Sequence, residues 1–211
     1  MDKNNSLYKD ELLTKIANHL IINASFITDL GIYHGRMGIV IFFAHYARYK
    51  DNSIYNDFAA ELLNDIYEDI SANTPFYFEY GLCGIGWGIE YLFKNKFVEE
   101  VSYEVLDHID KKIMEKDLMR ISDKNFKTGL AGISFYVESR LNSKSNNRKI
   151  HAFDESYLKK IKKNESKIVN SKPKDFLSEI LKDLPDNDDL HSIPLGLNKG
   201  CSGMGLKMLL Q

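Results

Sequence analysis

The sequence of 211 residues predicts an all-α protein made of stacked helical hairpins. Three observations support this fold class: several segments carry apolar residues at helical spacing, others are apolar on nearly every side, and a short glycine cluster precedes each segment of the second kind. The apolar-polar alternation that indicates strands is weak throughout. The pattern therefore alternates one-sided outer helices with enclosed inner helices, as in a helical repeat array.

The outer helices are predicted at residues 7–22, 53–70 and 102–114. In the second of these, Ser53 is the expected N-cap. Its apolar residues recur every four positions: Ile54, Phe58, Leu62, Ile66 and Ile70. The enclosed segments are 38–49, 88–94 and 133–141, and we expect them to be more buried than the outer helices because they lack a polar face.

Four glycine clusters introduce the enclosed segments. They are Gly31-Ile-Tyr-His-Gly-Arg-Met-Gly38, Gly81-Leu-Cys-Gly-Ile-Gly-Trp-Gly88, Gly129-Leu-Ala-Gly-Ile-Ser134 and Gly200-Cys-Ser-Gly-Met-Gly205. Counted from Gly31, their spacings are 50, 48 and 71 residues, the last widened by a basic insertion over 142–175. We interpret the basic residues of this insertion as a solvated helix face, and the whole of 1–211 as a single domain.

Each glycine costs about 1 kcal/mol of helix stability relative to alanine, so the clusters need a physical reason. Three explanations remain open: the glycines adopt left-handed turn conformations, they allow close approach of neighbouring backbone, or they expose N–H groups that bind a ligand. A phosphate loop is excluded because no Gly-Lys-Ser/Thr follows any cluster and no strand precedes one.

Composition excludes several classes of function. The net charge of −2 gives no reason to expect nucleic acid as a partner. No uncharged apolar run reaches the roughly 18 residues of a membrane span, and the first residues have no apolar signal-peptide core. Two cysteines cannot form a disulfide framework, so we expect a cytoplasmic location. We also expect that Cys83 and Cys201 do not form a disulfide with each other.

Two of the motifs, His34-Gly-Arg-Met-Gly38 and Gly81-Leu-Cys-Gly-Ile-Gly-Trp-Gly88, resemble those of lanthionine synthetase C-like (LanC-like) proteins. Similar repeats recur over 129–134 and 200–205. The resemblance implies an α/α toroid whose inner helices begin on one face. It also implies peptide modification, in which a zinc-bound substrate thiolate adds to a dehydrated Ser or Thr to close a thioether ring.

The zinc site that the resemblance implies, two Cys and one His, is not visible in this sequence. Ser202 follows Cys201 where the family places a histidine, and Cys83 lacks the family's preceding tryptophan. Cys83 and Cys201 are therefore weak metal candidates, and we expect no cofactor unless the cyclase chemistry is retained with zinc. His191 is an unsupported substitute ligand.

His34 is the catalytic candidate, because it matches the family's cavity-facing histidine and imidazole titrates near neutral pH. A hydrogen-bonded histidine that fixes a helix start is the alternative. Tyr33, Arg36 and Tyr80 flank the glycine turns and are expected to line a cavity mouth. Trp87 and Glu90, on an enclosed helix, are further candidates for cavity-lining or binding residues. Glu138 occupies the position equivalent to Glu90 in the next repeat, which favours a structural partner for both carboxylates. His45 is expected in the core.

The family's toroids contain about seven hairpins, whereas this sequence has four repeats. It is therefore either a fragment or a shortened member with an open edge, which favours self-association or a partner. The leading functional hypothesis is a peptide-binding or accessory protein of lanthionine-type peptide modification, with a precursor peptide as partner. The alternatives are an α/α-barrel carbohydrate-active enzyme, for which Asp29 and Glu79 are the nominated carboxylates, and a non-catalytic scaffold.

Overall fold

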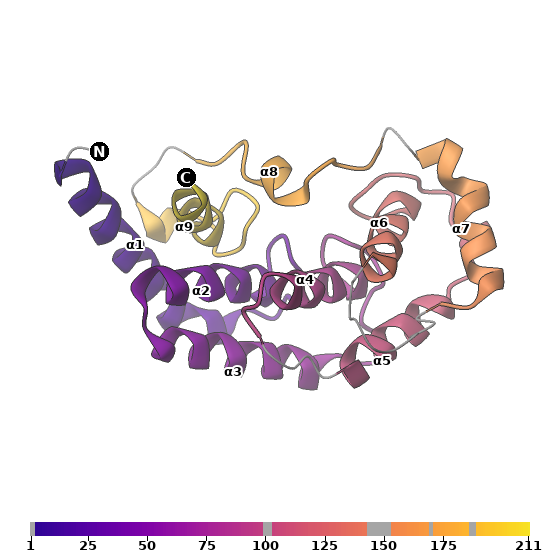
Figure 1. The fold of residues 1–211 in the computed structure, drawn as a ribbon, viewed down its shortest axis with the longest axis horizontal. Helices are drawn as coiled ribbons and strands as arrows, with labels where there is room; N and C mark the ends of the chain where they lie inside the picture. The colour runs from indigo at the N-terminus through magenta and orange to yellow at the C-terminus, as the bar shows by residue number, and fades with distance from the viewer. Residues whose placement is uncertain (1–2, 99–102, 143–152, 169–170, 186–188) are drawn as a thin grey trace. The chain divides into compact units, whose positions relative to one another are not determined.

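The computed structural model describes residues 3–98, 103–142, 153–168, 171–185 and 189–211, and within them every regular element is a helix (Figure 1). The predicted all-α fold is confirmed. The α-helices are α1 (Lys3–Asn23), α2 (Arg36–Lys50), α3 (Ser53–Asp69), α4 (Leu82–Lys94), α5 (Tyr103–Met114), α6 (Leu130–Leu141), α7 (Glu155–Ile168), α8 (Phe176–Ile180) and α9 (Cys201–Leu210). Short 3₁₀ turns are η1 (Ala24–Phe26), η2 (Leu118–Arg120) and η4 (Leu190–Ser192).

The chain divides into two compact units, which are described separately. Unit 1 comprises Met1–Asp69 and Asp175–Gln211, and unit 2 comprises Ile70–Lys174. The prediction of a single domain over 1–211 stays a prediction. Of the basic insertion, α7 lies in unit 2, and residues 143–152 lie outside the described part of the chain.

The contrast between inner and outer helices is confirmed in both units. In unit 1 most of α2 is buried, whereas α3 buries only Ala59, Leu62 and Ile66. In unit 2 most of α4 and α6 is buried, while α5 keeps a polar face. The predicted cap at Ser53 is wrong: α3 already begins there, and the side chain of Asn52 accepts the bond from the Ile54 amide at 3.1 Å.

The four inner helices begin in the same way. Each follows an N-cap glycine with extended backbone: Gly35, Gly81, Gly129 and Gly200. The first helical N–H then donates to the carbonyl seven residues earlier, as in Leu82 to Pro75 at 2.8 Å and Cys201 to Pro194 at 2.7 Å. The first repeat is therefore counted from Gly35 rather than Gly31, and the spacings become 46, 48 and 71 residues.

Close backbone approach explains these glycines. A Cβ on Gly81 would lie 2.1 Å from the Pro75 carbonyl oxygen, and one on Gly129 would lie 2.5 Å from that of Asp123. The left-handed alternative is wrong, because no glycine in the described residues has positive φ. The ligand-binding alternative is wrong for the first N–H of each helix, because the preceding loop's own carbonyl occupies it.

Inner helices pack against each other within each unit, and a glycine makes room for the neighbouring ring. In unit 2, a Cβ on Gly86 of α4 would lie 2.5 Å from the Tyr136 ring of α6. In unit 1, a Cβ on Gly205 of α9 would lie 2.4 Å from the Phe42 ring of α2. Each glycine stands five residues after its N-cap and each ring seven after its own. This recurring contact brings the starts of two inner helices together, as an α/α toroid requires.

Candidate functional site

His34 lies on the face of unit 1 where α2 and α9 begin. Its side chain is exposed, and its Nε2 lies 3.5 Å from the side-chain nitrogen (Nδ2) of Asn198. Asp29 fixes the turn before His34, because its carboxylate accepts from the Gly31 amide at 2.7 Å and its carbonyl accepts from the Arg36 amide at 2.9 Å. The position therefore combines an accessible imidazole with a rigid backbone.

The loop before α9 supports the His34 turn from the other side. The backbone N–H of Asn198 donates to the Tyr33 carbonyl at 2.8 Å. A Cβ on Gly196 would lie 2.5 Å from the His34 Cα, so only glycine allows the two turns to approach this closely. Two segments that are far apart in the sequence thus form a single surface around the imidazole.

Tyr33 and Arg36, the neighbours of His34 that are expected to line a cavity mouth, are both largely buried. Tyr33 is buried, and its ring lies 5.5 Å from that of Phe176. Arg36 is buried and pairs with Asp69, the last residue of α3, where a cation complements the helix dipole. The Nε of Arg36 is buried without a hydrogen-bond partner. His45, on the same helix, is half-buried, and burial followed by the charge of Arg48 lowers its pKa to about 4.

In unit 2 the predicted aromatic residues occupy two different environments. Tyr80 is exposed, with its ring 5.4 Å from that of Tyr77, and partial burial followed by neighbouring Tyr77 and Glu79 raises its pKa. Trp87 is buried and stacks on Tyr91 and on Phe135, with centroids 5.4 and 6.3 Å away. Of this pair, Tyr80 is accessible to a ligand and Trp87 is largely covered.

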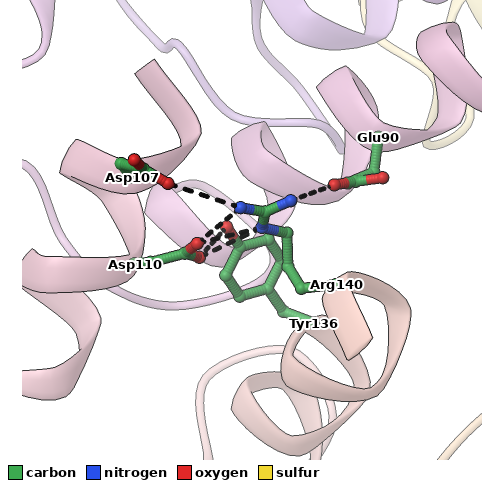
Figure 2. Close-up of polar contacts among 5 residues, drawn as sticks. All are labelled: Glu90, Asp107, Asp110, Tyr136 and Arg140. Atoms are coloured by element: carbon green, nitrogen blue, oxygen red, sulfur yellow. Dashed lines mark hydrogen bonds and ion pairs between the residues drawn. The ribbon is translucent and has the colours of Figure 1, made fainter. Parts of the chain in front are cut away.

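Glu90 belongs to a buried ionic cluster that joins α4, α5 and α6 (Figure 2). Arg140 on α6 pairs with Glu90 through one end of its guanidinium. The other end binds Asp110: Nη2 and Nε of Arg140 both donate to Oδ2 of Asp110, at 2.7 Å and 3.0 Å respectively. Tyr136 donates to the same carboxylate at 2.6 Å, and Asp107 lies 3.9 Å from Nη2. Glu90 thus has the structural partner that its repeat position favoured.

Burial dominates the electrostatics of this cluster. It raises the pKa of Asp110, and the hydrogen bonds and charge of Arg140 offset that rise only in part. Burial also raises the pKa of Tyr136, followed by the charge of Asp110. Two buried carboxylates share one buried guanidinium, so the cluster has a structural role in joining the three helices. It presents no accessible general acid.

A second ionic contact in unit 2 was not predicted. Lys172 donates to Glu138 at 2.5 Å and to the Ser134 hydroxyl at 2.9 Å. The repeat alignment pointed to Glu138, but the partner comes from the segment after α7, which no local pattern connects to α6. Glu90 and Glu138 therefore occupy equivalent helix positions and bind different cations.

Neither cysteine is suited to hold a metal. Both thiols are free and buried. Burial followed by nearby Asp110 raises the pKa of Cys83 well above its ordinary value, and burial raises that of Cys201 to about 11. Zinc binds the thiolate, which these surroundings disfavour. The Cys201 Sγ lies 3.7 Å from the Leu190 carbonyl oxygen, and no group of three metal-binding side chains occurs among the described residues. The family's zinc site therefore does not fit the residues present.

The family model for lanthionine synthetase C-like protein matches residues 27–179, which is most of the chain. The protein belongs to the lanthionine synthetase C-like family. The match includes the turns at Gly35, Gly81 and Gly129, and the fourth turn, at Gly200, lies beyond it. No curated protein and no solved structure matches significantly.

Membership in this family agrees with the all-helical fold and with the helix starts that the repeats share. No helix in the described parts of the chain is long and apolar enough to cross a membrane.

Proposed function

We propose that this LanC-like protein binds a peptide in lanthionine-type peptide modification, as a binding or accessory component rather than a zinc-dependent cyclase. The observation that carries the proposal is the exposed His34 on a rigid glycine turn in a chain of this family. A precursor peptide is the partner that the family suggests.

The state of the thiols supports the proposed lack of cyclase activity. Cyclisation needs a metal that holds a substrate thiolate, with about three protein ligands and one open position. Cys83 and Cys201 are buried and favour the protonated form, and Ser202 supplies neither thiolate nor imidazole. No step of the proposed function is therefore routed through zinc.

His34 would act by contacting the peptide. An imidazole on this turn offers one donor and one acceptor when neutral, enough to bind a backbone amide or a Ser or Thr hydroxyl of a peptide. The turn keeps its shape through its own hydrogen bonds, so the ring needs little ordering when a ligand binds.

The carbohydrate-active alternative has less support. Asp29 is engaged by the Gly31 amide, and Glu79 is paired with Lys127 at 2.9 Å. Both nominated carboxylates thus have structural partners, whereas a glycosidase needs one carboxyl group free to donate a proton and another to act as base or nucleophile.

The test is a titration by fluorescence anisotropy of a labelled synthetic peptide rich in Ser, Thr and Cys. We expect His34→Ala to weaken binding at least tenfold. The matched control is His108→Ala, which removes an exposed histidine from α5 in unit 2 and should leave the affinity unchanged. Equal affinity of wild type and His34→Ala would assign His34 a structural role, and no binding by wild type would remove the proposal.

Two further expectations accompany this function. We also propose that the protein self-associates, which light scattering after gel filtration measures directly. The two free thiols favour a reducing compartment, so we propose a cytoplasmic location.

A further inference from the structure

Two histidines from distant parts of the chain meet on unit 1, apart from the His34 turn. His19 lies on α1, and His191 lies in η4 before α9. Their ring centroids are 5.1 Å apart and the ring planes are nearly perpendicular, at 86°. His19 is half-buried and His191 is exposed, so solvent reaches the pair.

The backbone on both sides of this pair is held in place. At His19, the carbonyl accepts from the Asn23 side chain at 2.7 Å. At His191, the amide donates to the Asp189 carboxylate at 3.2 Å, and the Ser192 hydroxyl donates to the Asp189 carbonyl at 2.8 Å. The side-chain nitrogen of Asn23 also lies 3.5 Å from Nδ1 of His19, so both the backbone and the His19 ring are held near their observed positions.

The separation suits a shared metal ion. With a Zn–N bond of about 2.1 Å and a ring nitrogen about 1.1 Å from the ring centre, two imidazoles on one tetrahedral zinc have centroids about 5.2 Å apart. The observed distance is 5.1 Å.

We propose that His19 and His191 form a two-imidazole site for a first-row transition-metal cation such as Zn²⁺ or Ni²⁺. Imidazole suits these ions, whereas Mg²⁺ and Ca²⁺ require oxygen ligands. Two coordination positions stay open to water or to a ligand. A bound ion joins α1 to the loop before α9 and so stabilises unit 1. This site is separate from the family's thiolate zinc site, and it uses neither Cys83 nor Cys201.

The experiment uses tag-free, chelator-treated full-length protein, titrated calorimetrically with Zn²⁺, Ni²⁺ or Mg²⁺. We expect one equivalent of Zn²⁺ or Ni²⁺ to bind in the micromolar range and to raise the melting temperature, with no binding of Mg²⁺. His19→Gln and His191→Gln should each weaken Zn²⁺ binding at least tenfold, and His108→Gln, at an exposed histidine on α5, should leave it unchanged.

Circular dichroism shows whether each variant is folded, and the exposed position of His191 makes His191→Gln the decisive one. Zn²⁺ and Ni²⁺ affinities of folded His191→Gln equal to those of wild type would overturn the proposal. A wild-type protein that binds neither ion at submillimolar concentration would overturn it equally. Peptide binding is measured separately, with His34→Ala, so failure of one proposal leaves the other intact.

Discussion

Replacement of Arg140 by methionine removes the cation that contacts both Glu90 and Asp110. The carboxylate side chains are 6% and 2% exposed, so neither can turn to solvent without opening the packing of α4 against α5 and α6. Breaking a buried ion pair by removing one partner costs about 3–5 kcal/mol. Since Arg140 serves two buried carboxylates, we expect the free energy of unfolding of Arg140→Met to fall by an amount near the top of that range.

The assay is urea unfolding followed by the fluorescence of Trp87, the only tryptophan in the sequence, which lies in unit 2 with the cluster. Arg120→Met is the matched control. The Arg120 side chain is 89% exposed and lies 3.5 Å from Asp117, so its loss should change stability by less than about 1 kcal/mol.

The pH dependence gives the argument a second check. Arg140 lowers the pKa of Asp110, so in Arg140→Met the already raised pKa of this carboxyl rises further. A carboxyl group whose native-state pKa lies above its unfolded-state pKa destabilises the fold at neutral pH. This penalty shrinks as the pH falls from the native-state pKa toward the unfolded-state pKa, and it is absent below both. The stability difference between wild type and Arg140→Met should therefore shrink on acidification. A loss below about 1 kcal/mol at neutral pH, or a difference that grows on acidification, would refute the reasoning.

Three other predictions concern the helix starts, the thiols and the metal. Gly81→Ala places a Cβ 2.1 Å from the Pro75 carbonyl oxygen, so it should lose about 2 kcal/mol or more of stability in the same urea assay, and a neutral effect would contradict the close-approach explanation. Cys83 and Cys201 should react with a thiol reagent at about pH 8 only after unfolding, because both are buried and their pKa values are raised; rapid modification of native protein would argue against this. Zinc bound by the protein should be unchanged by Cys201→Ala in metal analysis, and stoichiometric zinc lost in that variant would restore the cyclase interpretation.

Much of the fold could be predicted because its signals are local. The all-round apolar character of residues 38–49 requires an enclosed helix in any context, and the one-sided pattern of 53–70 requires an outer one. The register of the first repeat could not be predicted, because Gly31 and Gly35 are equally good turn residues by composition. The carbonyl of Asp29, which closes the helix start at Arg36, distinguishes them only in three dimensions.

The candidate site was predicted less completely. His34 is exposed, whereas Tyr33 and Arg36, expected at a cavity mouth, are buried, and the functional roles of all three stay predictions. Side-chain direction at a helix start depends on which segment packs against it, and the loop at 194–200 is far away in the sequence.

The sequence alone determined the helical class, the repeats and the family motifs, because periodicity and glycine spacing are properties of neighbouring residues. The tertiary structure decided which charges meet and which rings face each other. Arg140 binds Glu90 and Asp110, and His19 meets His191, only because inner and outer helices pack in one arrangement. No local pattern encodes these contacts, since each joins residues that are brought together by the burial of separate apolar faces.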